Sequence, residues 1–440
     1  MAISPTPTDT SSTDPLPDTG EGTNVDAPDL RLFVFALFFI FGGITSLNDV
    51  IIPKLKDLFT LSYAQVMLVQ SAFFAAYFLI SIPGAAIVRR FGYMRTASIG
   101  LVLMTVGCLL FIPASSSATF SVFLFALFVL ASGITIVQVV ANPLISLLGP
   151  AKTTHSRLTF AQAFNALGTT VFPYFGSILI LGSLATVDPT TLSGAALDAY
   201  RAAETHTVVT TYLGLAVALL VVAAVVWTRR NRLQEQQDQT GSILHAFDLL
   251  KRPRFGFGAL CIFLYVGAEV AIGSLIVNYL MLDSTLGLSQ QAAGKHVPLY
   301  WGGALVGRFI GAGLLRLVSP GKLLAAVAAG SITLILISAN TVGVVSGYSL
   351  LAIGLMNSIM FPTIFSLASE GLGRRAAEGS GVICVAIVGG AVIPPLTGMI
   401  ADLSGSLAVA FTLPALCYAM IVLFGIYARR PALALREAHA

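Results

Sequence analysis

The sequence is poor in charged residues. Only 10% of its 440 residues are Asp, Glu, Lys or Arg, whereas a soluble domain carries about a quarter, and 56% are hydrophobic. This balance excludes an ordinary soluble protein and predicts a membrane protein. The net charge is only +4, and the basic residues behind it fall in short loops between apolar runs. We therefore expect the lipid bilayer as a partner, and no nucleic acid.

Cysteine and histidine are scarce as well. The four cysteines all fall in apolar runs, where a small buried hydrophobic side chain is their usual role. We therefore expect no disulfide and no metal site. The five histidines lie in predicted loops or tails, so none is a good proton carrier inside the membrane. We expect neither a cofactor nor an enzymatic activity.

The chain contains instead a series of long apolar runs. A helix of about 20 apolar residues crosses a bilayer. The runs are continuous rather than alternating, which excludes a transmembrane β-barrel. The sequence therefore predicts an all-α membrane protein of about twelve transmembrane helices. The predicted spans lie at roughly 30–52, 63–88, 94–112, 118–148, 157–181, 207–227, 257–281, 297–317, 321–338, 341–369, 379–400 and 405–428.

A polar segment, RRNRLQEQQDQTGSILHAFDLLKRPR, divides these spans into two sets of six. Pro143 and Pro362 are 219 residues apart, and Pro173 and Pro394 are 221 apart. These similar offsets indicate a duplication, and two six-helix halves with a site at their interface are the architecture of major facilitator transporters. The expected divisions are a tail at 1–29, a first half at 30–228, a linker at 229–255, a second half at 256–430 and a tail at 431–440.

Basic residues predict the orientation in the membrane. Eighteen of the 24 Lys and Arg fall on the side that carries both termini, and only Lys54, Lys56, Arg201 and Lys295 fall on the other. Cytoplasmic loops are enriched in basic residues, so both termini are expected in the cytoplasm. Residues 1–29 contain no Lys or Arg, so they are expected to form a disordered tail rather than a signal peptide.

Two acidic residues fall inside predicted spans. Of the 20 Asp and Glu residues, only Asp49 and Glu269 do so. An ionised side chain at the bilayer centre costs about 2.5–3.5 kcal/mol on insertion scales, so such residues usually face a wet cavity and mark a transport pathway. Both are therefore candidates for cation coupling. The alternative is an ion pair with Arg308, the one basic residue within a predicted span.

Neutral polar residues lie on shared helix faces inside the spans. Gln138 and Asn142 are four residues apart, and Tyr265 precedes Glu269 by four. Such sets bind sugars, because hydroxyl groups pair with amides and carboxylates while the C–H face stacks on an aromatic ring. The alternative is adhesion between helices, worth about 0.6 kcal/mol per polar contact. The expected sugar-binding residues are Asn48, Gln138, Asn142, Gln162, Asn165, Tyr265, Glu269, Asn278, Trp301 and Asn357.

Several segments together resemble the fucose:proton symporter family of the major facilitator superfamily, and especially its glucose/galactose transporter branch. The most specific features are the Ala-Asn-Pro motif after Gln138 and the paired Gln162 and Asn165. The segments are SLNDVIIPKLK, GITIVQVVANPLISLLGP, RLTFAQAFNALGTTVFPYFG, FLYVGAEVAIGSLIVNYL, GRFIGAGLL and GVICVAIVGGAVIPPLTGMIAD.

The resemblance implies roles for several of these residues. Asp49 matches a first-helix Asp tied to proton coupling, and Gln162 and Asn165 match residues that face the sugar cavity. Gln138 stands where the fucose symporter has Glu, which argues against fucose itself as the substrate. The segment GAAIVRRFGYMR resembles the superfamily's loop motif, with Arg89 in place of the motif's Asp.

We therefore expect a secondary active transporter of a bacterial inner membrane. It would import a hexose such as glucose or galactose, or a related amino or deoxy sugar, by symport with H⁺ through alternating access. Na⁺ is the alternative coupling ion. A proton-driven exporter of small hydrophobic compounds is a further alternative, which would need a more aromatic cavity. We expect the protein to be a monomer.

Replacing the two intramembrane acids should affect different steps, coupling for Asp49 and sugar binding for Glu269. Asp49→Asn should abolish uphill sugar accumulation but leave sugar exchange, because it removes the titrating group and not the cavity. Glu269→Gln should weaken equilibrium sugar binding by about 1.5–3 kcal/mol, the range for a hydrogen bond to a charged group. Calorimetric titration of both variants at two pH values and exchange in vesicles check this, and the opposite pattern would exchange the two roles.

Overall fold

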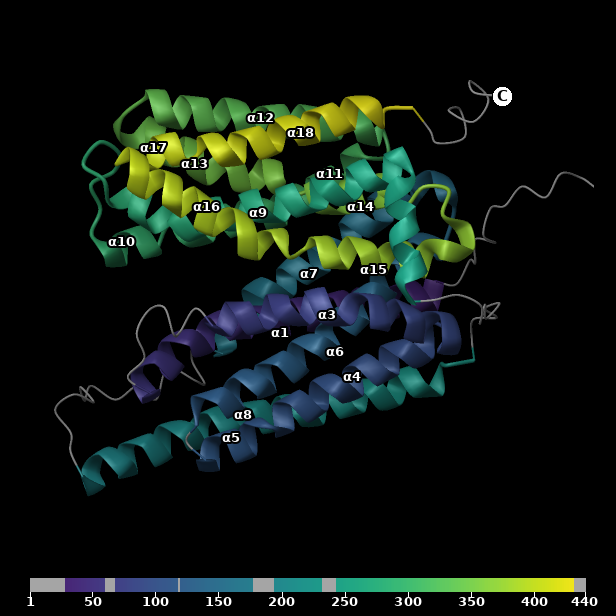
Figure 1. Cartoon of the computed structure of the whole chain (residues 1–440), viewed down its shortest axis with the longest axis vertical. Helices are drawn as coiled ribbons and strands as arrows, with labels where there is room; N and C mark the ends of the chain where they lie inside the picture. The colour runs from purple at the N-terminus through teal and green to yellow at the C-terminus, as the bar shows by residue number, and fades with distance from the viewer. Residues whose placement is uncertain (1–27, 60–67, 118, 177–193, 232–242, 431–440) are drawn as a thin grey trace, which may run out of the picture.

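The structure is a computed structural model that describes residues 28–59, 68–117, 119–176, 194–231 and 243–430. Within these ranges the chain forms helices joined by short connections, and no strand. Figure 1 shows two helical bundles packed against each other, the first half of the chain in one and the second half in the other. The predicted all-α fold of two helical halves is confirmed.

The first bundle follows the predicted spans closely. Each of the six spans corresponds to one helix, except that α4 and α5 share the third. The helices described there are α1 (Pro28–Phe59), α3 (Leu68–Phe91), α4 (Tyr93–Leu109), α5 (Phe111–Ser117), α6 (Phe120–Leu147), the short η1 (Ala151–Thr153), α7 (Thr154–Gly176) and α8 (Ala195–Thr228).

The second bundle contains more breaks. Its last three predicted spans are each a pair of helices with a short interruption, so that Asn357 lies directly before a break. The helices are η4 (Ile243–Lys251), α9 (Pro253–Met281), α10 (Gln290–Gly294), α11 (Val297–Leu314), α12 (Pro320–Asn340), α13 (Gly343–Asn357), α14 (Met360–Ala368), η5 (Gly373–Arg375), α15 (Ala376–Ala386), α16 (Gly389–Ser404), α17 (Leu407–Ala410) and α18 (Thr412–Tyr427).

Nine stretches of the described chain are long and apolar enough to cross a membrane. The other three predicted spans are α1, α7 and α11. The side chains of α1 are described only as far as Ser46, and the stretch Leu30–Ser46 is apolar. Polar residues make the other two less apolar, since α7 carries Arg157 and Gln162 and α11 carries Arg308. The two helices α7 and α11 pack on each other, so these two less apolar spans lie where the two halves meet.

The two bundles repeat the same helix contacts. In the first, α1 packs on α7, α4 packs on α6 and α8, and α3 packs on α6. In the second, α9 packs on α16, α12 packs on α13 and α18, and α11 packs on α13. The pairs correspond if α1 is matched with α9 and α8 with α18. An internal duplication produces this arrangement.

Glycine allows two corresponding helix pairs to approach closely. A Cβ atom at Gly168 of α7 would overlap the carbonyl oxygen of Phe39 on α1. A Cβ atom at Gly389 of α16 would overlap the carbonyl oxygen of Phe263 on α9. A backbone carbonyl inside a helix cannot move aside as a flexible side chain can, so both contacts require glycine.

Gly168→Ala should therefore destabilise the first bundle. The added methyl group forces α1 and α7 apart, and overpacking of this kind costs about 1–3 kcal/mol. The matched control is Gly214→Ala in α8, where an added Cβ would meet no atom within 4 Å. Thermal unfolding followed by size-exclusion chromatography of the purified variants checks this, and equal midpoints for the two variants would contradict it.

Candidate functional site

Glu269 lies at the centre of a hydrogen-bond network in the second bundle. The single Tyr265 hydroxyl proton, one turn earlier on α9, is shared between Glu269 Oε1 at 2.7 Å and the Asn357 carbonyl at 3.0 Å. The Tyr300 hydroxyl donates to the Glu269 carbonyl at 3.2 Å, and Asn357 Nδ2 donates to the Tyr300 hydroxyl at 2.9 Å. Three helices, α9, α11 and α13, thereby hold the glutamate in place.

This network leaves part of the glutamate free. Tyr265, Tyr300 and Asn357 are buried, whereas Glu269 is partly exposed. Its second carboxyl oxygen, Oε2, has no hydrogen-bond partner in the described part of the chain and is not enclosed. A carboxylate oxygen in this position can accept a hydrogen bond from a hydroxyl group.

Arg308 lies between the two halves without forming the ion pair considered for Glu269. Its Nε donates to the carbonyl of Ser358 at 3.3 Å, and its Nη1 donates to the carbonyl of Gln162 on α7 at 3.2 Å. Within the described side chains no ion pair joins Arg308 to Glu269. The guanidinium group therefore connects α11 to α7 through backbone acceptors.

The first bundle contributes amide side chains from α6 and α7. Gln138 is buried and accepts a hydrogen bond from the Tyr77 hydroxyl at 2.7 Å. Asn142, one turn later, is fully buried, and neither of its polar atoms has a partner in the described structure. Gln162 is buried on α7, and Asn165 donates from Nδ2 to the Phe38 carbonyl at 3.3 Å.

Two of the other predicted residues lie outside this network, and the side chains of two more are not described. Trp301 is 44% exposed and lies edge-on to Tyr300, with ring centroids 5.1 Å apart. Asn278 is exposed and stands apart from the network, because nine residues along a helix place it opposite Glu269. The backbone of Asn48 and Asp49 belongs to α1, but their side chains lie outside the described residues.

Sequence reasoning missed Tyr77 and Tyr300. Each is a single hydroxyl in an apolar run, and its partner is far away along the chain, 61 residues for Tyr77 and Gln138. The available signal was a tyrosine that interrupts an apolar run. Its hydroxyl group must find a hydrogen-bond partner inside the protein.

Side-chain contacts between the halves gather at one end of the molecule, which we call the contact end. There Arg89 of α3 pairs with Glu378 of α15 at 2.5 Å. The Ser156 hydroxyl of α7 donates to the Ala312 carbonyl of α11 at 2.7 Å, and Arg316 Nε donates to that hydroxyl at 3.1 Å.

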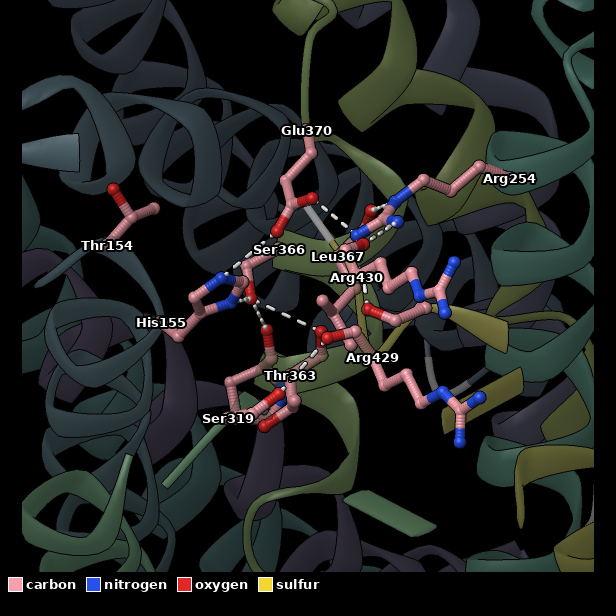
Figure 2. Close-up of polar contacts among 12 residues, drawn as sticks. Thr154, His155, Arg254, Ser319, Thr363, Ser366, Leu367, Glu370, Arg429 and Arg430 are labelled. Carbon is pink, nitrogen blue, oxygen red and sulfur yellow. Dashed lines mark hydrogen bonds and ion pairs between the residues drawn. The ribbon is translucent and has the colours of Figure 1, made fainter. Parts of the chain in front are cut away.

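His155 adds further contacts to this end, shown in Figure 2. Its Nδ1 lies 2.6 Å from the Ser366 hydroxyl, and its Nε2 lies 3.2 Å from Glu370 Oε1. Arg254 binds the other oxygen of Glu370 and donates to the carbonyls of Leu367 and Arg430, both at 2.9 Å. The first turn of α7 is thereby tied to α14 and to the start of α9.

The linker helix η4 joins the same end. Arg375 bridges Glu378 at 2.7 Å and Asp248 of η4 at 2.5 Å. The hydrogen bond from Arg375 holds the pKa of the Asp248 carboxyl below its ordinary value. A chain of alternating charges therefore runs from the linker through the second half to Arg89 in the first.

Comparison with protein families decides what kind of protein this is. The sequence profile of the Major Facilitator Superfamily matches residues 34–387. The chain belongs to the major facilitator superfamily. As a member of this superfamily it is a multi-pass membrane transporter and not an enzyme, as expected from the sequence.

Individual superfamily members are similar over most of the chain. A glucose/galactose transporter of Brucella abortus is 46% identical over 390 residues, which cover 89% of this chain and 92% of the relative. The L-fucose-proton symporter of Escherichia coli is 34% identical over 397 residues, covering 88% and 90%. The crystal structure of the major facilitator transporter FucP in the outward conformation aligns with a TM-score of 0.83 at 31% identity, covering 91% and 98%. The predicted resemblance is confirmed.

Arg89→Gln should loosen the contact end. It removes the charge paired with Glu378 but leaves Glu378 bonded to Arg375, so we expect a cost of about 1–3 kcal/mol, between that of a surface and a buried pair. Ala85→Cys supplies the reporter, because Ala85 is 2% exposed and a Cβ at Gly381 of α15 would lie 2.7 Å from its Cβ. Maleimide labelling of this cysteine should become at least about five-fold faster.

The matched control is Arg90→Gln with the same reporter. Arg90 is the next residue, is exposed, and its guanidinium lies 5.4 Å from the centroid of the Phe91 ring. The two substitutions remove the same charge from the same helix end. Equal labelling rates in the Arg89 and Arg90 variants would show that the pair with Glu378 does not hold the contact end closed.

Proposed function

We propose that this major facilitator protein imports a sugar together with a cation by alternating access. The observation that carries the proposal is the free Oε2 of Glu269 on α9 in the second half, with the amides of Gln138 and Gln162 on α6 and α7 of the first half. Carboxylate and amide groups from both halves suit a ligand with several hydroxyl groups. Trp301, half exposed beside Tyr300, offers an apolar ring face for the sugar C–H surface.

The similar proteins favour a hexose. The relative from Brucella abortus at 46% identity carries the name glucose/galactose transporter. Gln138 provides an amide that cannot ionise, and the buried pair of Tyr77 and Gln138 uses it as a neutral hydrogen-bond partner. We therefore propose glucose or galactose, or a related amino or deoxy sugar, as the substrate.

The proposed coupling ion is H⁺, with Asp49 as the titrating group and Glu269 as its partner acid. The name of the Escherichia coli symporter and the name of its solved structure describe fucose and proton transport by that protein. Na⁺ is kept as the alternative. The exporter of hydrophobic compounds is less favoured, because the free groups at the interface are amides and a carboxylate.

The proposed orientation places the contact end in the cytoplasm of a bacterial cell, at its inner membrane. Cytoplasmic loops are enriched in basic residues. The basic residues at this end include Arg89, Arg90, Lys251, Arg252 and Arg254. Contacts that close the cytoplasmic end correspond to an outward-facing state, the state named for the FucP structure. Both termini would be cytoplasmic, and the protein would act as a monomer.

Uptake of labelled glucose, galactose and fucose into proteoliposomes tests the proposal. We expect glucose or galactose to accumulate above equilibrium when an inward H⁺ gradient is imposed, and a protonophore to abolish the accumulation. Accumulation driven only by a Na⁺ gradient would replace H⁺ by Na⁺. Absence of uptake for all three sugars, with efflux of a hydrophobic cation instead, would support the exporter.

Two amide substitutions serve as a matched pair in this assay. Gln162→Ala removes a buried amide at the interface and should reduce uptake about ten-fold or more, as expected for one hydrogen bond to a ligand and the gap it leaves. Asn340→Ala removes an exposed amide of α12 that bonds only its own helix, to the Leu336 carbonyl at 2.8 Å. It should leave uptake unchanged.

A further inference from the structure

Tyr77 and Gln138 form a buried hydrogen bond between α3 and α6. The Tyr77 hydroxyl donates to Gln138 Oε1 at 2.7 Å, and the two side chains are only 4% and 7% exposed. The Tyr77 ring packs on Phe73, with ring centroids 5.4 Å apart. The hydroxyl is thus the one polar group of an otherwise apolar side chain, and it is directed at the amide oxygen.

This bond determines which end of the amide is available. A glutamine amide has one acceptor atom, Oε1, and one donor atom, Nε2. Because Oε1 is taken by Tyr77, Nε2 is the free atom. In the described part of the chain Nε2 has no acceptor, and it is not enclosed.

The reverse orientation of the amide is disfavoured. If Nε2 faced Tyr77, the Tyr77 hydroxyl would become the acceptor and its own proton would need another partner. The structure gives this hydroxyl no second acceptor among the described residues. A buried hydroxyl proton without a partner costs free energy comparable to that of a lost hydrogen bond. The amide is therefore oriented with Nε2 away from Tyr77.

We propose that Tyr77 is a positioning residue that gives the first half of the binding site a hydrogen-bond donor. Glu269 in the second half presents an acceptor, Oε2, so the two halves offer opposite polarity to one ligand. A sugar hydroxyl that donates to Glu269 and an oxygen that accepts from Gln138 would satisfy both. This inference rests on the proposed sugar transport.

A double-mutant cycle measures whether Tyr77 acts through the amide. The variants are Tyr77→Phe, which keeps the ring, Gln138→Met, which keeps the size, and the two combined. Equilibrium binding of labelled glucose and galactose to the purified proteins gives each dissociation constant. Tyr77→Phe should weaken binding about 2- to 12-fold. In the Gln138→Met background the same change should have no further effect, because the amide it orients is absent.

A control separates positioning from a general loss of packing. Tyr212→Phe also deletes a buried hydroxyl, on α8 where the ring stacks on Phe111 with centroids 3.9 Å apart. It should leave the dissociation constant unchanged. In vesicles Tyr77→Phe should raise KM and leave the maximal rate within about two-fold, since the bond orients a binding group.

A second experiment tests directly whether residue 138 presents a donor or an acceptor to the sugar. Gln138→Glu keeps an acceptor for the Tyr77 hydroxyl but presents an oxygen where Nε2 was. Monofluorinated analogues of the bound hexose carry an acceptor without a donor at each ring position in turn. At the position that meets residue 138, the fluorinated sugar should bind the wild-type protein at least about ten-fold more tightly than the Gln138→Glu variant.

The outcomes separate this inference from the proposed function. Wild-type protein that binds none of the tested sugars overturns the proposed function, and this inference with it. Wild-type protein that binds sugar, with Tyr77→Phe and Gln138→Met additive in the cycle, overturns the role of Tyr77 alone. So does a fluorinated series in which no position discriminates between wild type and Gln138→Glu.

Discussion

Inside a bilayer there is no water to satisfy a polar group, and this constraint governs the whole arrangement. Backbone groups are satisfied within helices, and many hydroxyls bond back to their own helix, as Thr96 does to the Gly92 carbonyl and Thr135 to the Ala131 carbonyl. Polar side chains that cannot do this must meet at helix interfaces. Against that background, the two buried atoms of Asn142 and the Oδ1 of Asn357 are notable because they have no partner in the described structure.

The same constraint explains why the polar helices lie where the halves meet. A helix that carries Gln162 or Arg308 gains nothing by facing lipid, so α7 and α11 face each other, and Arg308 bonds the backbone of α7. Helices with apolar outer faces, such as α8 and α12, pack within their own halves and expose many hydrophobic side chains. The position of the candidate site therefore follows from the distribution of polarity along the chain.

Composition and run length were enough to predict the membrane helices, because the length and polarity of a span are local properties. The two halves were predicted from the polar linker and the repeated proline positions. Helix periodicity correctly predicted that Tyr265 and Glu269 share one helix face, and the two side chains form a hydrogen bond. The same periodicity could have separated Asn278 from Glu269, because nine residues place them on opposite faces. Contacts such as Tyr77 with Gln138 or Asn357 with Tyr300 depend on which helices become neighbours, and a pattern within one helix does not contain that information.

The halves are joined by charged side-chain pairs at the contact end and by bonds to backbone carbonyls at the candidate site, and this separation suits a transporter. At the contact end the charged contacts between the halves join two side chains, Arg89 with Glu378 and His155 with Glu370. At the site itself the joining group is Arg308, and its acceptors are the backbone carbonyls of Gln162 and Ser358. Bonding to a carbonyl leaves the neighbouring amide side chain of Gln162 uncommitted. The groups suited to a ligand are thus not used to hold the two halves together. The side-chain pairs at the contact end can break without disrupting the candidate site.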